Sequence, residues 1–500
     1  MLLIKKLTLL KFFKRTIICL KQNEMNKDLT ILTVFFLIIT CFTSGQNNMS
    51  PRQVKSISDV DALANALKEK ILNSTATVNV SGTRYYVSNN GSDANNGKTP
   101  ENAWATLAKV SDASLQKGDA VLFERGGTWR GSLKALEGVS YSAYGSGPKP
   151  QLFGSLQNYS VKNKWKKTAT PNVYVYDEEI MDDAGLIVFN HGEANSVKMV
   201  TGIGGFTGTP AELKNDLEMF HNTADHKIYI CSVNGNPADR YSSIEFGLKK
   251  HIIRVTGDNV AIDNLCVKYG GAHGIGSGAR HGLKITNCEL GWIGGSIHHA
   301  PTRYGNAIEI YGECSDYTVD HCYIYQIYDA GITHQYKNPS STQTRIMEDV
   351  AYTNNLIEKC IYSIEYFLDQ PKSDKDVMKN IVIKNNICRL AGYGWGWQRH
   401  NKVARHIQGG WLKKRRKYPA ENFTVTGNIF DRSKDVLLSV SALKKEHLPV
   451  MLANTFIQDA KGNFGYYGTD YSAYYNMDDI SAQKLKKMGI DSNPVVLRVD

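Results

Sequence analysis

The chain has 500 residues, of which 42% are apolar and 21% are charged, so it can bury a large core and is not a disordered polymer. Its 43 glycines against 13 prolines are typical of many short strands joined by turns. The formal net charge is +11. Because residues 1–45 contain seven Lys or Arg and two Asp or Glu, the rest of the chain carries +6.

The first 45 residues have the pattern of an export signal. Met25 opens the better leader: a short polar start, an apolar run over 29–39 and small residues at 43–45, which predicts cleavage near Gly45. We therefore expect an exported protein, in the periplasm, at the cell surface or outside the cell. Cys41 raises the alternative of a lipid anchor, although Thr40 before it fits that poorly. The apolar run is short for a bilayer span, and no later segment is long and apolar enough.

Nine cysteines occur without any Cys-x-x-Cys pair, and Cys19 and Cys41 lie in the leader. Five of the other seven sit in or beside strand patterns where an apolar residue would fit: Cys266, Cys288, Cys314, Cys322 and Cys388. This predicts small buried thiols rather than disulfides or metal ligands.

Residues 46–82 are predicted to form a polar linker with one amphipathic helix, Val60–Leu72, that covers an end of the core. Residues 83–160 begin a different pattern, in which a strand, a turn-rich loop, a short helix at 106–110 and a second strand follow one another.

Three segments of this region are YYVSNNGSDANNG from Tyr85, WATLAKV from Trp104 and KGDAVLFERGGTW from Lys117. They resemble the opening of the right-handed parallel β-helix proteins of the pectate lyase-like superfamily. The resemblance covers about residues 83–460. It implies an all-β fold, a right-handed parallel β-helix or solenoid, and it specifies the fold better than the reaction.

Residues 161–247 break the pattern. Strand-like runs near 172–176, 185–189 and 226–230 predict an inserted antiparallel β excursion, which resembles inserts that wall one side of the cleft in carbohydrate-active β-helix enzymes.

A repeat becomes visible over residues 248–460. An Asn, or once a His, precedes a short apolar strand at gaps of 23, 34, 34, 31, 42 and 26 residues, and we assign these residues to one equivalent site: Asn264, Asn287, His321, Asn355, Asn386, Asn428 and Asn454. A fixed core with loops of variable length is what a solenoid predicts, and stacked Asn side chains can hydrogen-bond along its axis. Residues 461–500 are expected to form a C-terminal cap.

Another strand of each repeat predicts the candidate active site. One inward column is read as Ile275, Ile308, Ile332, Ile364 and Tyr393, and the next, outward, column as Gly276, Glu309, Thr333, Glu365 and Gly394. Glu309 and Glu365 would then project from one face about 10 Å apart at Cα, with Asp329 in the turn between them. Carboxylates grouped in this way suit cleavage of a glycosidic bond, so Glu309, Asp329 and Glu365 are the predicted catalytic residues. For each one alone, a solvated edge or turn cap is the ordinary alternative.

Six further residues are predicted to bind substrate: Arg303, Tyr304, His334, Trp395, Trp397 and Arg399. Arg303 and Tyr304 could hold a carboxylate or hydroxyl, and exposed tryptophans stack on sugar rings, whereas packing at the end of the core is the alternative. The histidines have no specific metal-ligand spacing, so no metal site is assigned. From Arg399 to Lys417 eight basic residues occur without an acid, which favours an anionic polysaccharide, unless the segment is only a solvated loop.

The sequence thus predicts a glycoside hydrolase that acts on a polysaccharide. If the basic run binds substrate, that polysaccharide is acidic. One alternative is a polysaccharide lyase, which would remove a proton beside a uronate and could use Ca²⁺ to neutralise the carboxylate. Another is a sugar-binding surface protein without catalysis. We expect a monomer with no nucleic-acid partner.

Overall fold

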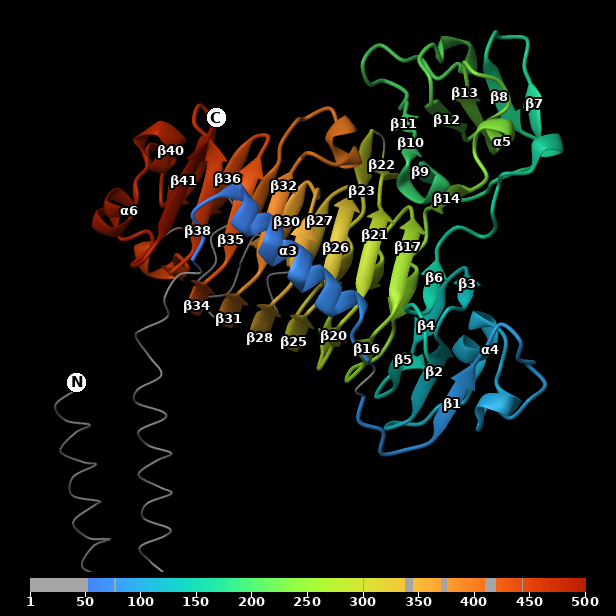
Figure 1. The fold of residues 1–500 in the computed structure, drawn as a ribbon, viewed down its shortest axis with the longest axis horizontal. Coiled ribbons are helices and arrows are strands. Elements are labelled where there is room, and N and C mark those ends of the chain that lie inside the picture. The colour runs from blue at the N-terminus through green and yellow to red at the C-terminus, as the bar shows by residue number, and fades with distance from the viewer. Residues whose placement is uncertain are drawn as a thin grey trace, which may run out of the picture. The chain divides into compact units, whose positions relative to one another are not determined.

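The computed structural model describes residues 53–75, 78–299, 301–337, 345–369, 376–409, 420–442 and 444–500. Most of this part of the chain forms strands, and most of the strands lie in three large sheets with mainly parallel pairing (Figure 1). The prediction of an all-β fold with parallel sheets is confirmed. The leader, and with it Cys41, lies outside the described residues.

Sheet 1 contains ten strands in one path, in this order: β1 (Arg84–Val87), β2 (Ala120–Glu124), β5 (Ser140–Tyr144), β16 (Ala261–Asp263), β20 (Lys284–Thr286), β25 (Cys314–Asp320), β28 (Ile346–Thr353), β31 (Val377–Lys384), β34 (Ala420–Thr426) and β37 (Val450–Leu452).

Sheet 2 follows the order β10 (Ala194–Asn195), β9 (Ala184–Phe189), β14 (Ile244–Leu248), β17 (Cys266–Gly270), β21 (Glu289–Ile293), β26 (Tyr323–Ile327), β29 (Leu356–Glu358), β32 (Ile387–Ala391), β35 (Ile429–Ser433), β38 (Thr455–Asp459) and β41 (Val495–Val499). Two further strands extend it beside β17: β3 (Thr128–Arg130) and β6 (Gln151–Phe153).

Sheet 3 follows the order β4 (Leu133–Ala135), β15 (Ile253–Val255), β18 (Ile275–Ser277), β24 (Ile308–Tyr311), β27 (Ala330–Lys337), β30 (Tyr362–Asp369), β33 (Arg405–Gly409), β36 (Val436–Ser441), β39 (Asn463–Gly468) and β40 (Tyr474–Asn476). From β15 onward the chain therefore visits sheets 3, 1 and 2 in turn, and then starts the next round beside the previous one. The loops that vary in length connect the strands, so they do not change the register of strand pairing in the core.

The interior between the sheets is filled by apolar columns. In sheet 3, Ile275, Ile308, Ile332, Ile364 and Ile407 pair in sequence and are all fully buried. The seven cysteines of the described residues are buried and form no disulfide, which confirms the prediction of buried thiols.

One helix crosses the outside of sheet 2 (Figure 1). This helix, α3 (Ile57–Leu72), begins with a capping box in which Ser56 and Asp59 satisfy each other's backbone N–H groups. Val60, Ala64 and Ile71 pack against sheet 2, whose contributing residues are Tyr323, Leu356, Ile387, Ile429 and Ile457. The helix predicted at Val60–Leu72 is therefore confirmed, and so is the short one near 106–110, observed as α4 (Leu107–Asp112).

Between β6 and β15 the chain forms a separate five-stranded sheet, mostly antiparallel. Its order is β11 (Val197–Lys198), β12 (Glu218–Asn222), β13 (Lys227–Cys231), β8 (Val173–Tyr176) and β7 (Trp165–Lys167). After β38 come the helix α6 (Ala482–Met488) and the final strand β41. Among the described residues, no helix has the length and apolar character that a membrane crossing needs.

The recurring Asn residues occupy two positions, not one. Asn264, Asn287 and His321 have positive φ angles of 56°, 51° and 50°, in the left-handed region that Asn tolerates. Strand pairing sets them level with Asn354, Asn385, Gly427 and Ala453. The single site inferred from sequence is thus wrong, because Asn occurs both at the bend residue and at the residue after it, and in two rounds at both.

The second position forms a buried ladder of Asn355, Asn386, Asn428 and Asn454. The Asn386 side-chain amide donates to Asn428 Oδ1 at 2.9 Å and to the carbonyl of Tyr352 at 2.8 Å. Its own Oδ1 accepts from the Asn355 side chain at 2.9 Å. Asp491 ends the ladder by accepting from Asn454 at 2.7 Å. Each amide therefore joins one round to the next.

We predict that Asn386→Leu lowers the free energy of unfolding by about 1–3 kcal/mol, because it leaves buried partners on Asn355, Asn428 and Tyr352 unsatisfied. Thermal melting measures the loss, and Asn90→Leu is the matched control because the Asn90 side chain is exposed. Equal melting of the two variants would show that the ladder does not stabilise the fold.

Candidate functional site

Glu309 lies on β24 in a row of paired residues across sheet 3. The row reads Gly276, Glu309, Thr333, Glu365 and Gln408. The first four residues of the predicted row, from Gly276 to Glu365, are therefore correct, and the fifth, Gly394, is wrong. Gln408 stands where Gly394 was expected, and Ile407 replaces Tyr393 in the inward column, because a 3₁₀ turn, η5 (Trp395–Gln398), is inserted before β33.

Glu309 is buried rather than exposed, with 7% of its surface accessible. Its Oε2 accepts hydrogen bonds from the side-chain amides of Asn306 and of Gln335, the second at 2.9 Å. Burial raises the pKa of the Glu309 carboxyl to about 7, despite these two hydrogen bonds, which act in the opposite direction. Glu309 thus carries its proton up to near-neutral pH.

His273 faces the other carboxyl oxygen of Glu309, with 3.2 Å between Nε2 and Oε1. The backbone N–H of Asn306 donates to His273 Nδ1 at 3.0 Å. Burial lowers the pKa of His273 to about 4, so the ring is neutral at pH 7. A neutral ring that accepts at Nδ1 carries its hydrogen on Nε2 and points it at Glu309.

His251 completes this group from the preceding round. Its ring centroid is 5.0 Å from that of His273, and burial lowers its pKa to about 4. Its buried Nδ1 has no hydrogen-bond partner among the described residues. A Cβ at Gly276 would lie 2.1 Å from that nitrogen, so the glycine at the start of the row provides the space for the His251 ring.

Asp329 lies in the turn before β27 and forms an ion pair with Arg399 at 3.1 Å. Its charge also acts on Glu309 and on His273, which places it in the same group. Burial, the largest single effect, would lower the pKa of Arg399, but Asp329 together with Tyr362 and Tyr328 raises it. Glu365, two strands from Glu309 in sheet 3, is also buried.

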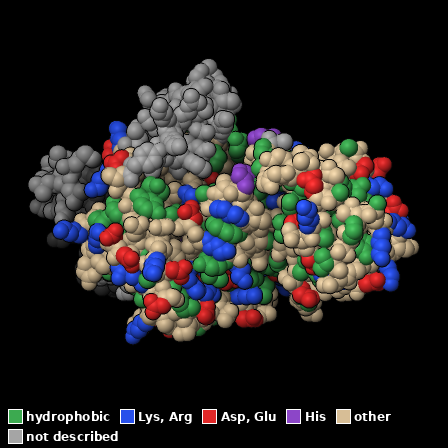
Figure 2. Space-filling view, turned by 90° about the horizontal axis from the view of Figure 1, so that it is seen from above, with side chains coloured by type: hydrophobic (Ala, Val, Ile, Leu, Met, Phe, Trp, Pro, Cys, Tyr) green, Lys and Arg blue, Asp and Glu red, His purple; other side chains and the backbone are tan. Residues whose placement is uncertain are grey.

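A pocket of about 270 Å³ lies beside this group. Its lining includes Lys198, Arg303, Tyr328, Gln398, Arg399 and His400. Arg303 and Arg399 both hold their guanidinium groups over the Tyr328 ring, at 4.4 and 5.2 Å from its centroid. Basic and acidic side chains are interspersed over the face shown in Figure 2. The residues that line this pocket, by contrast, include Lys198, Arg303 and Arg399 and no acidic residue.

The inserted segment contributes one wall of the pocket. Lys198 is buried and donates to both carboxyl oxygens of Asp183, at 2.5 and 2.6 Å, and to the carbonyl of Ala184 at 2.7 Å. Burial lowers the pKa of Lys198 to about 8, although Asp183 opposes the shift. The backbone N–H of Lys198 donates to Gln398 Oε1 at 2.8 Å, which joins the insert to the turn that precedes Arg399.

Arg303 and Tyr304 lie on β23 (Thr302–Tyr304), which pairs with β22 (Ser296–His299). Arg303 is buried and donates to the carbonyls of Gly295 and Gly185 at 2.6 and 3.0 Å and to Gln398 Oε1 at 3.1 Å. Its guanidinium is therefore largely held by the protein. The Tyr304 ring lies 5.1 Å from the His273 ring and connects the hairpin to the Glu309 group.

Two residues predicted to bind substrate, His334 and Trp395, are buried in the protein and cannot contact a substrate. His334 is fully buried in the core, where its Nδ1 lies 2.7 Å from the Tyr352 hydroxyl. Trp395 is buried and its indole donates to the carbonyl of Gln326 at 2.7 Å. Trp397 is half-buried under the ammonium groups of Lys402 and Lys434, 5.4 and 5.2 Å from its ring. Trp411 and the basic residues 413–417 lie outside the described residues.

Sequence reasoning missed the side chains that surround Glu309, namely His251, His273, Asn306 and Gln335. Asn306 stands three residues before Glu309, but nothing in that spacing indicates a bond. The other three come from neighbouring rounds, so only the register brings them together. Among the described residues, no group of three or more His, Cys, Asp or Glu side chains is arranged to hold a metal ion.

The chain matches no protein-family model, and a search of curated proteins finds no significant match. Solved structures with partial similarity include the complex of XylC with xylose, with 11% identity, a TM-score of 0.43 and coverage of 79% of this chain and 73% of that one. A structure described as a glycoside hydrolase has 10% identity and a TM-score of 0.42, with coverage of 83% and 96%. An alginate lyase from Paenibacillus sp. str. FPU-7 has 12% identity and a TM-score of 0.34, with coverage of 79% and 96%.

The pKa of Glu309 predicts a pH dependence of stability. Because the folded pKa is about 7 and the ordinary value is 4.5, the contribution of this group to the free energy of unfolding is fully present below pH 4.5. It is lost as the pH rises through 7, by roughly 3 kcal/mol.

We expect Glu309→Gln to abolish this change. Thermal melting from about pH 4.5 to about pH 8 should show the wild-type protein losing stability relative to the variant. His251 and His273 are present in both proteins, so the effect of their titration on stability largely cancels in the difference between the two melting curves. A constant difference between the two melting curves would contradict a raised pKa.

Proposed function

We propose that the protein is an exported glycoside hydrolase that cleaves a polysaccharide, and that Glu309 is its general acid. The observation that carries the proposal is the burial of Glu309, which raises its pKa to about 7 and keeps it protonated near neutral pH. We also infer that the rounds of strands across sheets 3, 1 and 2 wind as a right-handed parallel β-helix over residues 248–460.

The contacts of Glu309 assign its proton to one oxygen. Oε2 accepts two side-chain amides, and the Nε2–H of His273 points at Oε1. A proton on Oε1 is therefore directed away from His273, which leaves it for a substrate oxygen. The neutral imidazole orients the carboxyl group and does not compete for its proton.

Hydrolysis needs a second carboxylate. Glu309 protonates the glycosidic oxygen as the bond to the anomeric carbon breaks, and a water oxygen takes the place of the leaving group on that carbon while the second carboxylate accepts the water's proton. Asp329 and Glu365 are the two candidates for this base. Asp329 interacts electrostatically with Glu309, and Glu365 lies two strands away, about 10 Å at Cα.

One observation favours a second candidate function, a polysaccharide lyase. Lys198, Arg303 and Arg399 line the 270 Å³ pocket with only Asp183 and Asp329 as ion-pair partners among the described residues, so the lining has an excess of positive charge. Such a pocket suits the carboxylate of a uronate. Tyr304 would be the remaining base of this mechanism, because His334 is enclosed and Arg303 is held by carbonyls. No step is assigned to Ca²⁺.

We predict that Glu309→Gln lowers turnover by about a hundredfold or more, the scale of losing a general acid, while substrate binding persists. Glu365→Gln and Asp329→Asn test the base, although Asp329→Asn also leaves the buried Arg399 without its carboxylate. Glu348→Gln on β28 is the control, because it makes the same change in sheet 1.

The assay is a panel of neutral and uronic polysaccharides, read for new reducing ends and for the ultraviolet absorbance of unsaturated uronates. Hydrolysis gives reducing ends without absorbance. Absorbance that survives in Glu309→Gln and disappears in Tyr304→Phe would replace the hydrolase with the lyase. Binding without any product would instead indicate a non-catalytic sugar-binding protein.

A further inference from the structure

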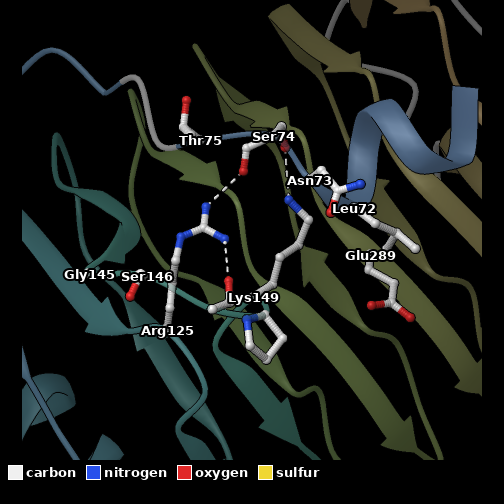
Figure 3. Close-up of a pocket in the computed structure, with 11 residues that line it drawn as sticks. Leu72, Asn73, Ser74, Thr75, Arg125, Gly145, Ser146, Lys149 and Glu289 are labelled. Atoms are coloured by element: carbon white, nitrogen blue, oxygen red, sulfur yellow. Dashed lines mark hydrogen bonds between the residues drawn. The ribbon is translucent and has the colours of Figure 1, made fainter.

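A second pocket lies at the end of α3, and none of its lining residues belongs to the Glu309 group. It has a volume of about 690 Å³. It is bounded by the residues that follow the helix, by Arg125 after β2, by the segment 145–149 and by Glu289 of β21 (Figure 3).

Two cations converge at this pocket. Arg125 donates to the carbonyl of Ser74 at 2.8 Å and to Asn264 Oδ1 at 3.0 Å. Lys149 donates to Asn264 Oδ1 at 2.7 Å and to Ser74 Oγ at 2.9 Å. The guanidinium and the ammonium thus share one neutral amide oxygen, and Figure 3 shows both side chains directed toward the segment after the helix.

Neither cation has a carboxylate within ion-pair distance among the described residues. Asp263 is close enough to act electrostatically on both, but its oxygens accept from Ser142, Thr286, Asn287 and Asn264. Glu289, the acidic residue of the lining, forms an ion pair with Lys268 at 2.7 Å. Asp263 therefore compensates the two cations at this pocket only in part, and neither cation has a carboxylate of the described residues in direct contact.

This arrangement is electrostatically unfavourable without a further partner. Lys149 is 3% exposed, and buried cations are normally paired with an anion. Burial lowers the pKa of Lys149 and also that of Arg125, and the charge of Arg125 lowers the pKa of Lys149 further. An oxyanion in the pocket would relieve both effects.

A purely structural role is the competing explanation. The cations bind the residues just after α3, and positive charge near a helix C-terminus stabilises the helix. One cation would serve that purpose. Two of them beside a 690 Å³ space, a volume in the range of small-molecule sites, indicate a ligand as well.

We propose that this pocket binds a carboxylate or sulfate group carried by a small organic molecule, with Arg125 and Lys149 as its ligands. A free inorganic oxyanion has the same binding chemistry and is the other source. The site is separate from the Glu309 group, so the proposal does not depend on the hydrolase activity.

The test is calorimetric titration of the full-length protein with sodium glucuronate, sodium sulfate or glucose, at constant ionic strength in chloride. We expect binding of glucuronate and none of glucose. Arg125→Gln and Lys149→Gln should each weaken it at least tenfold. Lys134→Gln should bind normally, because Lys134 is exposed on β4 and does not line the pocket.

Ser146→Asp keeps the test valid if the Gln variants fail to fold. Ser146 is exposed on the pocket lining, so the new carboxylate should repel an anion without disturbing the core. Binding of sulfate without glucuronate would support the oxyanion site and assign it to an inorganic ion. No binding of either anion, or equal binding in wild-type and Ser146→Asp proteins, would overturn the proposal and leave the helix-capping role.

Discussion

The parallel register of the three sheets is the constraint on which the rest of the structure depends. Each round of the chain lies about 4.8 Å from the next, so a residue type that repeats in register becomes a continuous row. An apolar row gives the Ile column of sheet 3, and a row of amides gives the ladder from Asn355 to Asn454. A buried amide satisfies its neighbour only if the register holds, so the ladder opposes any slip of one round against another.

The same register builds the candidate site. His251, Glu309 and Gln335 belong to the rounds of β15, β24 and β27, and the His251 ring lies over Gly276 of the intervening strand β18, which pairs with Glu309. Gly276 is required in the row because the His251 ring occupies the place of a side chain. The consequence is a carboxyl group that is enclosed by neutral donors and loses most of its hydration. Its raised pKa follows mainly from that enclosure, and the charge of Asp329 adds a smaller effect in the same direction.

Sequence patterns predicted the strands and much of the register, because alternation and repeat both report the core. The row from Gly276 to Glu365 was predictable for this reason. The prediction of register failed at Gly394, because the inserted turn η5 shifts the register there. It also failed at the Asn residues, because two adjacent positions favour the same amino acid for different reasons. The surroundings of Glu309 were not predictable, since an outward position in a strand normally faces solvent. Here the hairpin β22–β23 and the inserted segment cover that face, and loop sequences do not reveal what they cover.

The two charged regions differ in how the protein compensates burial, and this difference assigns them different chemistry. Near Glu309 the negative charge is removed by protonation, and Asp329 and Lys198 each have a partner of opposite sign. At the end of α3 a guanidinium does not release its proton at physiological pH, Asn264 offers only a neutral oxygen, and Asp263 compensates the two cations only in part. A proton that is held weakly enough to be given away suits catalysis. A fixed positive charge that is only partly compensated suits the binding of an anion.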